Sequence, residues 1–155
     1  MFYNKKVMQY FLNPRNTGII KNADGRGKVG NILCGDVMEI FIKVGKNKKG
    51  EEIIKDIKFK TLGCPAAIAT SSVVTELAKG KTLKEAMKIT NQDVIKFLGR
   101  LPPIKYHCSL LAEQALAEAI YNYLKKSKKR IPRELEKKHK EILKFEKEFY
   151  EKFKS

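Results

Sequence analysis

The spacing of apolar residues in the first part of the chain predicts one short helix and a pair of strands. Residues 4–12 place apolar side chains on one helical face, and the glycine-rich segment 15–36 is expected to be loop with at most a short strand. Residues 37–44 and 53–62 have the composition and alternation of strands, which we expect to pair as an antiparallel hairpin. The alternation slips at Asp56–Ile57, which indicates a bulge.

After Gly63 the apolar spacing becomes helical. Helices are predicted over residues 65–79 and 107–125, with two shorter ones between them, one capped by Thr82 and one beginning at Asn91. This order predicts an α+β fold, in which a small antiparallel sheet of about three strands packs against several helices.

The last 30 residues differ in composition from the rest. We expect a first domain over residues 1–125 and a basic, Lys/Glu-rich helical extension over residues 126–155, with Pro132 in its first turn. A narrow apolar stripe marks this helix, formed by Leu135, Ile142, Phe145, Phe149 and Phe153. Such a stripe indicates a helix packed on its own domain, with contact to another chain as the alternative.

The formal charge of +16 raises the question of nucleic-acid binding. Lysines scattered among glutamates are typical of a solvated surface, and the sequence holds no recognisable nucleic-acid motif, so we do not expect nucleic acid as a partner. Neither a secretory signal nor a membrane-spanning stretch is recognisable, and we expect a cytoplasmic protein with no membrane association.

Three cysteines without a signal sequence argue against a disulfide framework. Buried apolar thiols would be one interpretation. However, Cys64 falls at the predicted start of a helix, and Cys108 at the start of another, where free N–H groups and the helix dipole favour a thiolate. Cys34 lies in the loop Cys34-Gly35-Asp36, which can bring a thiol and a carboxylate to one centre.

Three thiolates and either Asp36 or His107 would make four donors, a set that suits zinc or an iron–sulfur cluster. Clusters that stay in place are normally held by four thiolates. Three thiolates with one weaker ligand therefore favour a carrier over an electron-transfer protein.

Several ordered motifs resemble the IscU and N-terminal NifU family of iron–sulfur scaffold proteins over residues 3–124. They are Asn13-Pro14-Arg15-Asn16, Cys34-Gly35-Asp36, Phe59-Lys60-Thr61-Leu62-Gly63-Cys64, Ala67-Ile68-Ala69-Thr70-Ser71-Ser72, Thr75-Glu76, Leu101-Pro102-Pro103-Ile104-Lys105 and His107-Cys108-Ser109-Leu110-Leu111-Ala112-Glu113.

This resemblance implies a scaffold protein, not an enzyme, on which a [2Fe-2S] cluster is built from iron and sulfur and then transferred. It implies Cys34, Cys64 and Cys108 as cluster and metal ligands, with Asp36 and His107 as further ligands. Cys108 would be the persulfide acceptor, and zinc can occupy the same site in the apo form.

The resemblance also implies the partners. They are a cysteine desulfurase of the IscS/NifS type, an electron donor such as ferredoxin, apo iron–sulfur proteins, and an Hsp70-type chaperone with its co-chaperone. The chaperone would bind Leu101, Pro102, Pro103, Ile104 and Lys105, and we expect the Leu101-Pro102-Pro103 part of this segment to be extended and stiffened. Tyr3 matches a tyrosine implicated in self-association, so a homo-oligomer is a further expectation.

A zinc-bound sulfur-transfer protein of the SufU type is the alternative, because it uses the same cysteines. That branch carries an insertion between the second and third cysteines and lacks the histidine before the third. Here Cys64 and Cys108 are close in sequence and His107 is present, which favours IscU.

Overall fold

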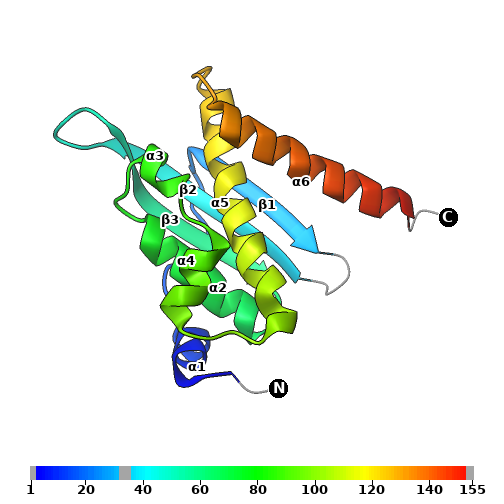
Figure 1. Cartoon of the computed structure of the whole chain (residues 1–155). Coiled ribbons are helices and arrows are strands. Elements are labelled where there is room, and N and C mark those ends of the chain that lie inside the picture. The colour runs from blue at the N-terminus through cyan, green and yellow to red at the C-terminus, as the bar shows by residue number, and fades with distance from the viewer. Residues whose placement is uncertain (1–2, 32–35, 153–155) are drawn as a thin grey trace.

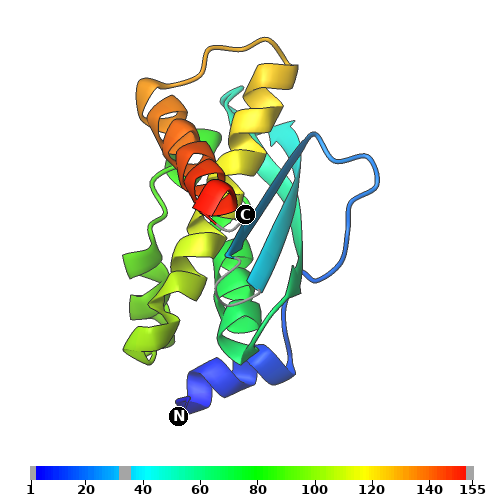
Figure 2. The same ribbon diagram turned by 90° about the vertical axis from the view of Figure 1, so that its right-hand side faces the viewer.

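The computed structural model describes residues 3–31 and 36–152, which form a three-stranded antiparallel sheet with helices on one face (Figures 1 and 2). The strands follow the order β1 (Gly25–Asn31), β2 (Asp36–Lys46) and β3 (Glu52–Leu62). This arrangement confirms the predicted α+β class.

The predicted hairpin is confirmed in β2 and β3. Their pairing runs from Val37 opposite Leu62 to Lys46 opposite Glu52, and it shifts between Lys43 and Val44. Because Lys43 pairs with Asp56 and Val44 with Ile54, Lys55 is left without a partner. The bulge therefore exists, one residue before the predicted slip.

Strand β1 lies in the segment that was predicted to be mostly loop. Its glycines allow a close approach to α5 (Tyr106–Lys126), which packs directly on this strand. A Cβ atom at Gly25 would lie 2.3 Å from the Ala119 carbonyl oxygen, and one at Gly27 would lie 2.2 Å from that of Ala115. The strand thus depends on packing between distant parts of the chain, which a local pattern does not reveal.

Different helices pack on different strands of the sheet. α2 (Pro65–Ala78) contacts β3, while α5 contacts β1 and β2, and the two helices also contact each other. α1 (Lys5–Leu12), capped by the Asn4 side chain, packs on α2. Side chains with no exposed surface fill the space between these layers, among them Met38, Ile40, Ile42, Ile57, Val73, Ala112 and Ile120.

Two short helices connect α2 to α5. α3 (Leu83–Ala86) begins with the predicted capping box of Thr82 and Glu85. α4 (Asn91–Leu98) begins at Asn91, as predicted, and Thr90 is its N-cap. A 3-10 turn, η1 (Pro103–Lys105), then leads directly into α5.

The C-terminal helix α6 (Arg133–Lys152) packs on α5, as expected for an amphipathic helix on its own domain. Leu135 and Ile142 are buried and join the core, whereas Phe145 is 53% exposed. The side chains of Phe149 and Phe153 lie outside what the structure describes. Within residues 3–31 and 36–152, no helix is both long enough and apolar enough to cross a bilayer.

The contact between β1 and α5 makes a stability prediction. Gly27→Ala should lower the free energy of unfolding by about 1–3 kcal/mol, because the added methyl group overlaps the α5 backbone. Guanidinium denaturation at equilibrium measures this. Gly30→Ala on the same strand is the matched control, since the nearest atom to its added Cβ lies at 3.5 Å. Equal midpoints for the two variants would contradict the packing argument.

Candidate metal centre

Three chain segments meet at one end of the sheet. Asp36 is the first residue of β2, Cys64 is the N-cap of α2, and His107 and Cys108 lie in the first turn of α5. The predicted positions of both described cysteines at helix starts are therefore confirmed. Cys34, the third predicted ligand, lies outside the described residues.

The distances around the Cys108 thiol fit a metal-binding group. Its sulfur lies 3.4 Å from Asp36 Oδ2, 3.5 Å from His107 Nε2 and 3.8 Å from Cys64 Sγ. The ligand atoms of Asp36, His107 and Cys108 all lie within 4.8 Å of one another. Ligands about 2.0–2.3 Å from a tetrahedral ion lie roughly 3.3–3.8 Å apart, so small side-chain movements would close this group around a metal.

The strand register explains why Asp36 is here. Val37 pairs with Leu62, so the residues that flank this pair, Asp36 and Gly63, are also brought together. A Cβ atom at Gly63 would lie 2.7 Å from Asp36 Oδ1, so the carboxylate occupies space that only glycine leaves free.

Burial is graded across the centre. Cys108 has no exposed surface and Asp36 is buried, whereas Cys64 and His107 are partly exposed. The Thr70 hydroxyl, from the middle of α2, donates to the Cys108 carbonyl and joins this turn of α5 to α2. Sequence reasoning assigned Thr70 only to a family motif.

The two described thiols share one proton in the metal-free chain. A hydrogen bond from Cys108 lowers the pKa of Cys64 to about 5, with help from the Ala67 backbone N–H and the Lys105 ammonium. The same hydrogen bond, together with burial and the Asp36 carboxylate, raises the pKa of Cys108. Cys64 is thus the thiolate and Cys108 the thiol that donates to it.

Lys105 and Tyr3 complete the electrostatic surroundings of Cys64. Burial works against the charge of Lys105, but the Cys64 thiolate and Tyr3 outweigh it and raise the pKa of the ammonium. Burial and the nearby Cys64 raise the pKa of Tyr3 as well. Lys105 was predicted only as part of a chaperone-binding segment, although its place two residues before His107 indicates that it lies near the site.

The segment from Leu101 to Lys105 differs from the expected extended peptide. Leu101 is buried in the core, Pro102 has an extended backbone, and Pro103–Lys105 form the turn η1. Ile104 is 68% exposed. The expectation of an extended conformation is therefore wrong at Pro103, because a turn begins there that continues directly into α5.

The shared proton predicts how Cys64 reacts. Because its pKa is lowered, Cys64 stays a thiolate as the pH falls, and its alkylation by iodoacetamide in metal-free protein should decline only near pH 5. Cys108→Ala removes the hydrogen-bond donor and should move this midpoint toward about 8.5. Peptide mass spectrometry identifies the alkylated residue, and denatured protein supplies the ordinary midpoint. An unchanged midpoint in the variant would refute the shared proton.

Comparisons with known proteins agree with this geometry. Residues 2–130 match the model of the NifU-like N-terminal domain. Iron-sulfur cluster assembly scaffold protein IscU 1 of Archaeoglobus fulgidus is 56% identical over 127 residues, covering 82% of this chain and 80% of that protein. The IscU protein of Aquifex aeolicus is 47% identical over 124 residues, covering 80% and 77%.

A solved structure shows the same fold. FiSufU of Fervidobacterium islandicum AW-1, described as an iron–sulfur cluster assembly scaffold for the SUF system, superposes with a TM-score of 0.63 at 25% identity, over 76% of this chain and 96% of that one. Together with the match over residues 2–130, these likenesses show that the chain belongs to the IscU/NifU N-terminal family.

Proposed function

We propose that this protein is a scaffold on which a [2Fe-2S] cluster is assembled and from which it is transferred to apo-proteins. The observation that carries the proposal is that Asp36, Cys64 and His107 converge on the sulfur atom of Cys108. Relatives that are about half identical to this chain bear the name of iron–sulfur cluster assembly scaffolds. The cluster is cargo, and the protein acts as a carrier and not as an enzyme.

Cys34 supplies the third thiolate in this proposal. It precedes Asp36 by two residues in the motif Cys34-Gly35-Asp36 that the chain shares with the family. Asp36 and His107 each lie within 3.5 Å of the Cys108 sulfur, and either can be the fourth ligand. A ligand set with one oxygen or nitrogen donor is exchangeable, which suits a cluster that must leave.

Sulfur arrives by transfer from a persulfide on a cysteine desulfurase to Cys108. The Cys108 sulfur attacks the outer sulfur of the persulfide, the S–S bond breaks, and the desulfurase cysteine leaves as a thiolate. Before attack Cys108 must lose its proton, and the Cys64 thiolate at 3.8 Å is placed to accept it. Cys108 has no exposed surface, so the desulfurase must first open the start of α5.

The remaining partners follow from the chemistry and the family. Assembly of a [2Fe-2S] cluster from iron and sulfane sulfur consumes electrons, which a donor such as ferredoxin supplies. An Hsp70-type chaperone, with its co-chaperone, binds Leu101–Lys105. Because Leu101 is buried, either the chaperone binds only the exposed part of the segment around Ile104, or Leu101 leaves the core when the chaperone binds. Self-association through Tyr3 and a cytoplasmic location complete the proposal.

A zinc-bound sulfur carrier is the second candidate, because the same donors suit zinc and the fold is shared with FiSufU. Sequence identity to known proteins favours the scaffold over the zinc-bound carrier. The chain is 56% identical to a protein named as an IscU scaffold and 25% identical to FiSufU, and it keeps His107. Zinc bound to this site would then be an occupant of the apo form.

Anaerobic reconstitution tests the scaffold. With iron, sulfide and thiol, the wild-type protein should take up about two iron atoms per site and show the visible absorption of a [2Fe-2S] cluster. Cys34→Ser, Cys64→Ser and Cys108→Ser should each lose most of this absorption because each removes a thiolate. Circular dichroism checks that the variants fold. A wild-type protein that binds only zinc under these conditions would refute the scaffold.

Asp36→Ala tests the source of lability. We expect the reconstituted cluster to survive several times longer in air than that of the wild type, because the exchangeable oxygen donor is gone. The decay of visible absorption measures this. Asp56→Ala is the matched control, since Asp56 lies six residues from Leu62 along β3, about 20 Å from the site. Faster decay in Asp36→Ala would show that the carboxylate protects the cluster.

A further inference from the structure

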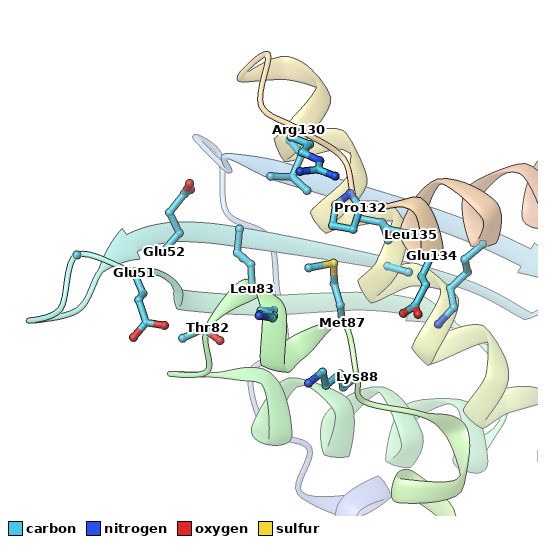
Figure 3. A pocket seen from close by; sticks show the side chains of 15 residues that line it. Glu51, Glu52, Thr82, Leu83, Met87, Lys88, Arg130, Pro132, Glu134 and Leu135 are labelled. Atoms are coloured by element: carbon cyan, nitrogen blue, oxygen red, sulfur yellow. The ribbon is translucent and has the colours of Figure 1, made fainter.

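A cavity of about 630 Å³ lies on the side of the molecule where α6 begins, remote in sequence from the cysteines and their turn (Figure 3). Its walls come from four places: the end of the β2–β3 hairpin, α3, the C-terminal half of α5 and the first turns of α6. Sites for small molecules usually measure about 300–1,000 Å³, so the cavity has a suitable size.

The floor of the cavity is apolar. Leu83 and Met87 come from the α3 region, Leu124 from α5 and Leu135 from α6. Leu83, Leu124 and Leu135 are each buried by neighbouring elements, and Figure 3 shows Met87 pointing into the space between Leu83 and Leu135. This surface offers contact to the apolar chain of a small molecule.

The rim is charged, and some of its charges are already paired. Glu52 forms an ion pair with Lys129 at 2.6 Å, and Lys138 lies 3.8 Å from Glu113. A second set has no ion pair among the described residues, namely the cations Lys84, Lys88 and Arg130 and the carboxylates Glu51 and Glu134.

The unpaired cations favour an anionic head group. They outnumber the unpaired carboxylates, and the whole chain carries a formal charge of +16, which adds an attractive field for anions. In Figure 3, Arg130 and Lys88 lie on opposite sides of Met87. A head group held from this rim would therefore leave the rest of its molecule over the apolar floor.

We propose that this cavity binds a small amphipathic anion, a molecule with a short apolar chain and one carboxylate head group. The head group lies toward Arg130, the apolar part covers Met87 and the leucines around it, and Lys84 and Lys88 add to the positive charge of the rim. The family match ends at residue 130, so the wall formed by α6 belongs to the part of the chain beyond the matched domain.

Decanoate is the probe, titrated into the full-length protein by calorimetry below its micelle-forming concentration. We expect one saturable site. The triple variant Lys84→Ala, Lys88→Ala, Arg130→Ala should bind about tenfold more weakly, as should decanol, which has the same chain without the charge. The control Lys21→Ala, Lys28→Ala, Lys60→Ala removes the same charge from exposed positions outside the cavity and should change affinity less than twofold.

Nuclear Overhauser contacts locate the bound molecule. The methyl group of Met87 should contact the decanoate chain, while signals of residues around Cys64 stay unchanged. Three results would each overturn the proposal: no binding at millimolar decanoate, equal weakening in the two triple variants, or saturation without a contact to Met87. None of these readouts involves the metal centre, so the outcome is independent of the scaffold function.

Discussion

The candidate metal centre depends above all on the register between β2 and β3. With Val37 opposite Leu62, the carboxylate of Asp36 lies beside Gly63, and Cys64 follows directly as the N-cap of α2. A slip of one residue would turn Asp36 to the other face of the sheet and separate it from Cys108. The bulge at Lys55 lies toward the other end of the hairpin and leaves this pairing undisturbed.

The two described thiols of the centre differ in charge, because the pKa of Cys64 is lowered and that of Cys108 is raised. Cys64 at the start of α2 carries the negative charge, and the neighbouring Cys108 keeps the proton. The Lys105 ammonium offsets part of this charge at the mouth of the site, while Asp36 opposes further ionisation within it. A metal cation would relieve that opposition, so its arrival and the loss of the Cys108 proton favour each other.

Local sequence patterns predicted the elements that depend on strand alternation or on helix caps. The hairpin, the capping box at Thr82 and the helix starts at Cys64 and Cys108 were all readable, because strand alternation and caps act over a few residues. Strand β1 was not, since glycines disfavour strands and only the contact with α5 makes them useful there. The burial of Leu101 was not predicted for a similar reason: it comes from distant elements and not from its proline neighbours.

Side-chain contacts between α5 and α6 determine how the C-terminal helix packs on the rest of the chain. On α5, the carboxylates of Glu113 and Glu118 are largely buried, and each has a partner on α6, Lys138 at 3.8 Å and His139 at 2.7 Å. The His139 ring also stacks on Tyr121, with ring centroids 3.7 Å apart. Buried carboxylates need such partners, so only one rotation of α6 satisfies both. Leu135 and Ile142 add apolar contacts to the same interface, so α6 is held by core packing and oriented by the polar pairs.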